Sequence, residues 1–168
     1  MTGDLRSLVL LAATLTTGLM AGLYFAFSVA VMPGLARADD RTFIETMQRV
    51  NTAILNGWFT LAFGGALVLG VTAAVLHRSG QGRPALPWII AGVVLYTASL
   101  VITMGFNVPL NNHLADAGTP AHIHDPAAVR ERFETAWVHW NTARTLLTTG
   151  ALGCLAWAMR TAGSTGRV

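Results

Sequence analysis

Four long apolar runs, uncharged except for one arginine in the fourth, dominate the sequence and limit what the chain can fold into. Each run has roughly the 20 residues needed to cross the hydrocarbon layer of a bilayer. In lipid every backbone polar group must be satisfied internally, so each run is predicted to be a helix. We therefore predict an all-α fold for residues 1–168, a single integral membrane domain built as a four-transmembrane-helix bundle. The predicted spans are about 8–32, 54–76, 86–106 and 137–159.

Charge and cysteine content agree with this class. Only 11% of the residues are charged, whereas soluble domains carry about 25%. All basic residues are arginine, and no basic face is interleaved with aromatic residues, so we expect no nucleic-acid partner. The lone Cys154 lies inside an apolar run and is predicted to be a small packing residue.

The arginines near the ends of the spans predict an orientation. Arg6, Arg78, Arg83, Arg160 and Arg167 lie in short segments on the side that holds both termini. Five more are spread over much longer segments on the other side: Arg37, Arg41, Arg49, Arg130 and Arg132. The higher density on the first side predicts that both termini are cytoplasmic, in an inner or plasma membrane. The first run, at about 25 residues, exceeds a signal-peptide core and is predicted to be a retained span.

The links between the spans differ in kind. After the first span, Asp39 or Asp40 can cap a short amphipathic interfacial helix in which Phe43, Met47 and Val50 fall at helical spacing. The sequence AVRERFETAW, residues 128–137, is predicted to extend the fourth helix outward. The sequence NVPLNNHL, residues 107–114, is predicted to be a turn, because proline and asparagine favour turns.

The fourth run carries a polar face. At about 100° per residue, Trp137, Trp140, Asn141 and Arg144 share one broad side of the helix. A guanidinium within a span costs at least about 2.5–3.5 kcal/mol, so Arg144 is expected to face the bundle interior. Two roles remain open for it: a structural clamp that pairs with helix ends or reaches the interface, or a ligand-binding group in a polar cavity. His139 lies about 200° away and is assigned to another face.

Other polar residues are candidates for the same cavity. Asn107 and Asn111 are expected to fold back over Arg144 from the end of the third span, while Asn112 is either a third lining amide or a turn residue. In the first span, Tyr24 and Ser28 are four apart and either line the cavity or pack within the bundle. Gln48 and Asn51 of the interfacial segment either face the cavity mouth or cap the second span.

No metal or organic cofactor is predicted. His122 and His124 form a His-x-His pair, with His113 as a possible third ligand, but no cysteine or carboxylate arrives at a recognised ligand spacing. We assign them as loop histidines and keep a copper or iron site as the alternative. The sequence has no nucleotide-binding glycine loop and no HExxH or GxSxG motif.

Four stretches of the chain resemble the anthrone oxygenase-like membrane family. They are AGLYFAFSVAVMPGL, FIETMQRVNTAILN, NVPLNNHL and WVHWNTARTLL, in that order. The resemblance implies a four-helix membrane bundle. Some members, mostly from fungal polyketide pathways, oxidise anthrones to anthraquinones with O₂, and the resemblance implies a related activity for this chain.

The candidate residues suit that chemistry. An anthrone loses a benzylic proton to give an enolate that reacts with O₂ directly, so an enzyme needs a base and oxyanion donors. We therefore predict an oxidoreductase acting on a hydrophobic aromatic or quinone-like substrate, with lipid as its only other expected partner and an open oligomeric state. The alternative is a non-enzymatic protein that binds or carries a lipophilic ligand. The predicted catalytic residues are Arg144, Asn141, Asn107, Asn111 and, as the base, His113; the predicted substrate-binding residues are Trp137, Trp140, Asn112, Tyr24 and Ser28.

Overall fold

The computed structural model describes residues 2–164, and their architecture is helical throughout. The prediction of an all-α fold is confirmed, since no strand occurs within residues 2–164. The longer helices and π-helical segments are α1 (Thr2–Ala26), η1 (Phe27–Val31), α3 (Asp40–Ala53), α4 (Gly57–Leu76), α5 (Leu86–Ile102), η3 (Thr103–Asn107), α6 (Val108–Asp116) and α7 (Pro126–Ser164). The short segments are α2 (Met32–Leu35), η2 (Gly80–Ala85) and η4 (Pro120–His122).

Three helical stretches of the described chain are long and apolar enough to cross a membrane. They are Gly3–Leu35, Gly57–Leu76 and Gly82–Asp116, with mean hydropathies of 1.8, 2.1 and 2.1. The first and third run continuously through π-helical segments, so both are longer than the predicted spans. The fourth predicted span lies inside α7, whose charged N-terminal part extends outward from Trp137 to Pro126, as predicted.

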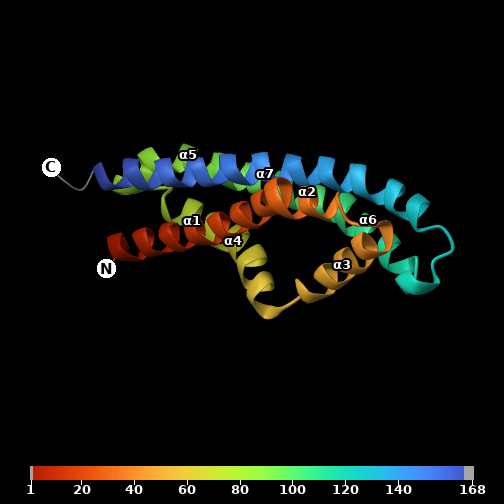
Figure 1. Cartoon of the computed structure of the whole chain (residues 1–168). Helices are drawn as coiled ribbons and strands as arrows, with labels where there is room; N and C mark the ends of the chain where they lie inside the picture. The colour runs from red at the N-terminus through yellow and green to blue at the C-terminus, as the bar shows by residue number, and fades with distance from the viewer. Residues whose placement is uncertain (1, 165–168) are drawn as a thin grey trace.

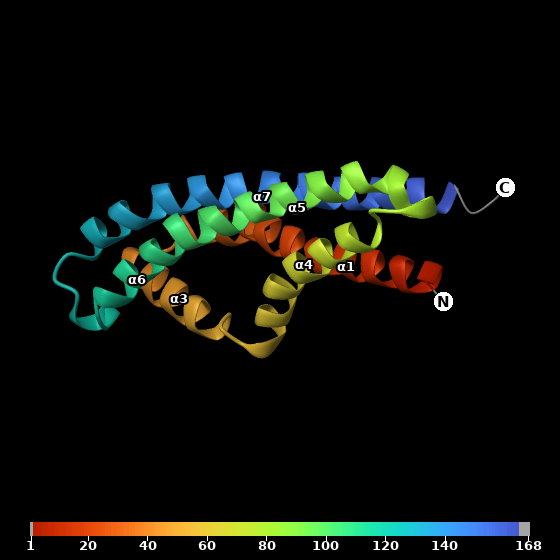
Figure 2. The same cartoon turned by 180° about the vertical axis from the view of Figure 1, so that it is seen from behind.

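The helices form an elongated bundle with two unlike ends (Figure 1). Helices α1, α4, α5 and α7 pack together at the end that holds both termini. Helix α4 does not extend to the other end of the bundle. There α3 lies at a steep angle beside α6 and the N-terminal part of α7 (Figure 2). Asn56 lies at the corner between α3 and α4. Its side-chain oxygen accepts hydrogen bonds from the backbone amides of Trp58 and Phe59 at 3.0 and 3.1 Å and so caps α4.

Helix α3 confirms the short amphipathic helix predicted after the first span, and its position at a membrane interface stays a prediction. The side chain of Asp39 caps it, accepting a bond from the Thr42 amide at 3.0 Å. Its apolar stripe enters a core with residues of α2, α6 and α7, and Phe43 and Met47 are fully buried there. The residues at helical spacing therefore form one apolar face, as predicted. The burial of this face fixes α3 across one end of the bundle.

The prediction of a turn at NVPLNNHL is wrong. The chain passes from the π-helical segment η3 directly into helix α6, so these residues continue the third span. Pro109, which lacks an amide hydrogen, follows the π-helical segment η3, where the backbone already departs from the regular α-helical hydrogen-bond pattern. The chain leaves the helix only near Ala117 and Gly118, where Gly118 adopts a φ of +84°.

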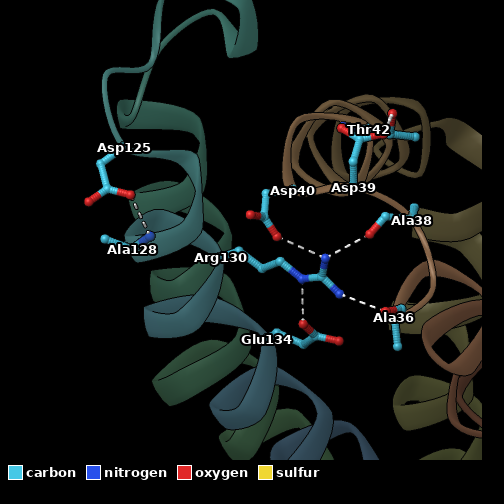
Figure 3. Close-up of polar contacts among 9 residues, drawn as sticks. All are labelled: Ala36, Ala38, Asp39, Asp40, Thr42, Asp125, Ala128, Arg130 and Glu134. Carbon is cyan, nitrogen blue, oxygen red and sulfur yellow. Dashed lines mark hydrogen bonds and ion pairs between the residues drawn. The ribbon is translucent and has the colours of Figure 1, made fainter.

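Arg130 ties the outer end of α7 to the corner between α2 and α3 (Figure 3). Its guanidinium donates hydrogen bonds to the carbonyls of Ala36 and Ala38 at 3.0 and 2.9 Å. It also pairs with Asp40 at 3.0 Å and with Glu134 at 2.7 Å, which raises the pKa of Arg130. The side chain is only 14% exposed, so these bonds hold the segment that positions α3.

Replacing Arg130 with methionine is expected to lower the free energy of unfolding by about 2 kcal/mol, the scale of hydrogen bonds to a charged group. Thermal unfolding in detergent, followed by circular dichroism, measures this. The exposed Arg132 provides the control, and its replacement by methionine should change stability by less than about 0.5 kcal/mol. Equal stability of both variants would show that Arg130 does not hold this corner.

The cap of α3 is expected to respond to acid. Hydrogen bonds from Thr42 hold the pKa of Asp39 below its ordinary value of 3.8. A carboxyl whose folded pKa is lowered adds stability above its unfolded pKa and loses it as the pH falls through the folded pKa. Exchange of the Thr42 amide hydrogen should therefore accelerate below about pH 4 relative to other α3 amides. In an Asp39→Asn variant this acid-specific acceleration should disappear, and its persistence would exclude Asp39 as the cause.

Candidate functional site

A large cavity lies where α1, α3, α4, the third span and α7 meet. Its volume is about 1000 Å³, at the upper end of the range for small-molecule pockets. One wall is apolar and aromatic, formed by Leu23, Phe27, Phe59, Phe63, Met104 and Val108. A second part of the lining, called the floor below, is polar and is formed by Tyr24, Thr103, Asn107, Asn111, Trp137, Asn141 and Arg144. Helix α3 adds Gln48 and Asn51 at the outer part.

Arg144 is the central charge of this floor. It is 6% exposed, and its guanidinium lies between two aromatic rings, 4.3 Å from the ring centroid of Tyr24 and 5.5 Å from that of Trp137. It donates from Nη2 to Asn141 Oδ1 at 2.9 Å and, more weakly, from Nη1 to Thr103 Oγ1 at 3.4 Å. Its Nε has no partner, and none of the ion pairs within the described part of the chain includes it.

Asn141 holds Arg144 against the first span. Its Nδ2 donates to the backbone carbonyl of Tyr24 at 3.0 Å and to Ser28 Oγ at 2.9 Å, while its Oδ1 accepts from Arg144. Ser28 is also bonded to Thr145 Oγ1 at 3.0 Å. Ser28 therefore stands behind Asn141 and outside the cavity lining, where it orients the amide and has no place for the substrate contact that we predicted.

Two π-helical segments adjoin this site. Tyr24 lies one turn before η1, and Ser28 lies within it. Thr103 and Asn107 are the first and last residues of η3. A π-helical turn widens a helix by one residue and is frequent at functional sites. Here the two widened turns, on the first and third spans, both supply side chains to Arg144 or its neighbours.

The asparagines of the third span reach the same floor, as predicted from the sequence. Asn107 is 1% exposed and directs Nδ2 toward the carbonyl of Trp137 at 3.4 Å, while its Oδ1 has no partner. Asn111 accepts a hydrogen bond from Trp137 Nε1 at 2.8 Å. Both line the cavity with Arg144, although they reach it from a continuous helix and not from a turn.

Besides Ser28, two more predicted site residues lie outside the cavity lining. Trp140 stacks on Phe106, with ring centroids 3.8 Å apart, and Phe106 is 41% exposed, so this pair lies outside the cavity lining. His113 is exposed and does not line the cavity, because it lies about 200° around α6 from Asn111. The positions of these residues therefore do not support the predicted roles of Trp140 in substrate binding and of His113 as the base. Asn112 is exposed and lines the outer part of the cavity.

Sequence reasoning missed part of the site. Thr103 was not singled out, because its spacing of four residues from Asn107 is a weak signal and its burial is known only from the structure. Gln48 was not missed, since it was predicted either to face the cavity mouth or to cap the second span. It lines the cavity and donates from Nε2 to the carbonyls of Leu114 and Gly118 at 2.8 and 3.0 Å, which ties α3 to the end of α6. The aromatic wall residues Phe59 and Phe63 carry no signal that separates them from other apolar residues of a span.

The histidines do not form a cluster in the part of the chain that the structure describes. Within residues 2–164, no group of three or more histidine, cysteine, aspartate or glutamate side chains is placed to hold a metal ion. The proposal of no resident metal therefore remains a prediction that metal analysis of the purified protein must test.

Together, these observations describe a small helical protein with three helices that are long and apolar enough to cross a membrane, and with an arginine-lined cavity between its helices. The model of the anthrone oxygenase family matches residues 56–154, which is more than half of the chain. The chain belongs to the anthrone oxygenase family, and the recognition made from its motifs is confirmed. Asn107, Asn111 and Arg144 lie within the matched region, whereas Tyr24 and Ser28 precede it. No curated protein and no solved structure matches the chain.

Proposed function

We propose that this protein is a membrane-embedded oxidoreductase of the anthrone-oxygenase type, which uses O₂ to oxidise a hydrophobic aromatic ketone. The observation that carries the proposal is a buried arginine without a carboxylate partner, which lines a cavity together with apolar and aromatic side chains. Such a charge favours an anion, and an apolar wall favours a flat ring system. The enolate of an anthrone is an anion and also a flat ring system.

The cavity suits the chemistry of the first step. The substrate oxygen accepts a hydrogen bond from Arg144 Nε, which has no other partner, and the guanidinium stabilises the negative charge that forms when the benzylic proton leaves. A water molecule in the open outer part of the cavity accepts this proton. The enolate carbon then combines with O₂ to give a peroxide anion, which takes up a proton, and loss of water from the resulting hydroperoxide gives the second ketone. The balance is R₂CH₂ + O₂ → R₂C=O + H₂O, with no external reductant.

The membrane arrangement that we propose has four spans, with α7 as the fourth. The C-terminal part of α7 packs along α1 and α5, both of which are membrane-spanning by length and composition. Arg144 then faces the bundle interior and avoids lipid. Both termini lie at one end of the bundle (Figure 1), which suits the predicted cytoplasmic location of both in an inner or plasma membrane.

A lipophilic substrate is proposed to enter from the bilayer. The outer rim of the cavity includes Leu55 and Met104, which are 77% and 59% exposed. Exposed apolar side chains at a cavity rim suit contact with lipid tails and with a substrate dissolved among them. The residues that α4 and η3 contribute to the cavity wall between this rim and Arg144 include no charged side chain.

The test of the proposed function is oxygen transfer by the purified protein. Anthrone is supplied in detergent micelles with ¹⁸O₂, and O₂ consumption is followed with an electrode. We expect one O₂ consumed per anthrone, with one ¹⁸O atom in the new ketone and the other in water. A rate no higher than that of protein-free micelles, where anthrone oxidises slowly by itself, would contradict the proposal.

A structural role for the same cluster is the second candidate. Asn141 links α7 to the first span through two hydrogen-bonding partners, the Tyr24 carbonyl of α1 and Ser28 Oγ of η1, which is also what a clamp between helices requires. On that account the cavity binds or carries a lipophilic ligand without reaction. Stability and turnover of an Arg144 variant separate the two roles, because a clamp supports folding and a catalytic group supports turnover.

A further inference from the structure

Among the described residues, three buried side-chain polar atoms have no hydrogen-bond partner. They are Asn51 Nδ2, Asn107 Oδ1 and Arg144 Nε. Asn107 and Arg144 are buried and Asn51 is half-buried, and all three residues line the cavity described above. Buried polar atoms in proteins nearly always have partners, so three unmet atoms in a single cavity indicate a ligand that supplies them.

The three atoms lie on two different walls. Asn107 and Arg144 belong to the polar floor, on the third span and α7, and the proposed function places a substrate oxygen there. Asn51 belongs to α3, which crosses the outer end of the bundle. Its neighbours in the cavity wall include Gln48, whose amide is already bonded to the end of α6, so Asn51 Nδ2 is the available amide donor of this helix.

We infer that Asn51 is a specificity-determining residue, which donates a hydrogen bond to a second acceptor oxygen on the ligand, apart from the oxygen held by Arg144. This rests on the proposed function for the inner end of the ligand. The substrate class is then a polycyclic ketone that carries a carbonyl, ether or other acceptor oxygen on a peripheral ring. A ligand with an apolar group at that place leaves the Asn51 amide buried and unpaired, which disfavours its binding.

Xanthones provide the probes, because a ring oxygen replaces the oxidisable carbon and no turnover occurs. Binding of the four monomethoxyxanthones to the full chain in detergent is compared with that of the ethylxanthones of the same position. Methoxy and ethyl groups are similar in size, but only methoxy accepts a hydrogen bond. At one ring position or more, wild-type protein is expected to bind the methoxy compound about 5-fold or more tightly than its ethyl partner.

The Asn51→Leu variant should bring this ratio close to one, because leucine is similar in size and has no donor. Partitioning of each xanthone into micelles is the same for both proteins and cancels in the comparison. Thr46→Val is the matched control, since Thr46 is on the same helix and does not line the cavity, and it should keep the wild-type ratio. Asn51→Asp should reverse the preference, favouring a hydroxyxanthone over the methoxyxanthone of the same position.

The outcomes separate this inference from the proposed function. If unsubstituted xanthone binds and Arg144→Gln weakens it, but no methoxy compound exceeds its ethyl partner, the role of Asn51 is wrong and the inner site stands. A ratio that persists in Asn51→Leu overturns the inference in the same way. If no xanthone binds to wild-type protein, both the aromatic-ketone site and the role of Asn51 are overturned.

Discussion

Replacing Arg144 with glutamine is expected to lower the rate of anthrone oxidation by about 100- to 1,000-fold, the effect of removing one oxyanion donor from an active site. Glutamine keeps a polar side chain of moderate length beside Asn141 but carries no charge. Because Arg144 is buried without a carboxylate partner, its removal should leave the thermal unfolding midpoint unchanged or raise it. Oxygen-electrode turnover and thermal unfolding in the same detergent measure the two effects.

The control for this variant is Arg132→Gln, which removes an exposed arginine from the same helix and should keep wild-type turnover. A folded Arg144→Gln protein with wild-type turnover would contradict the catalytic role. A large loss of stability would favour the clamp, because a group whose role is to hold helices together must stabilise them.

Replacing Asn141 with leucine is expected to lower the free energy of unfolding by about 3 kcal/mol and to abolish measurable turnover. The substitution removes the partner of Arg144 Nη2 and the donor that reaches the Tyr24 carbonyl and Ser28. Each buried polar group left without a partner costs about 1–3 kcal/mol. Unfolding in detergent with increasing sodium dodecyl sulfate measures the loss of stability.

Thr142→Leu is the matched control for Asn141→Leu, since Thr142 is the next residue of α7, is exposed and bonds only to the Val138 carbonyl of its own helix. Its stability should stay within about 0.5 kcal/mol of wild type. If Asn141→Leu were as stable as this control, the hydrogen bonds of Asn141 would not be holding α7 against the first span.

The helices of this fold are largely predictable from the sequence, because lipid-compatible runs and caps have strong signals. The apolar runs place the helical spans, and Asp39 with the stripe of Phe43 and Met47 places α3. The π-helical segments carry no comparable signal, because they depend on contacts between spans. For that reason NVPLNNHL was assigned to a turn: its proline and asparagines have turn propensity, but packing against α3 and α7 keeps the residues helical.

The site was predictable to the extent that one helix displays it. Helical periodicity groups Trp137, Asn141 and Arg144 correctly, because all three lie on the inner face of α7. It also groups Trp140 with them, and only the neighbouring Phe106 shows why that ring lies outside. Contributions from other helices require their relative rotation, which a single sequence does not provide, and Thr103 was missed for this reason.

The most direct measurement of the central claim is the infrared carbonyl band of xanthone bound to the protein. The claim is that Arg144 donates a hydrogen bond to the ketone oxygen of an aromatic ligand in the large cavity. Xanthone labelled with ¹³C at its carbonyl gives a band that is separable from the amide bands by isotope difference. In wild-type protein the band should lie at lower wavenumber than in detergent alone, and in Arg144→Gln it should return to the detergent position. A band at the detergent position in wild-type protein with bound xanthone would contradict the account.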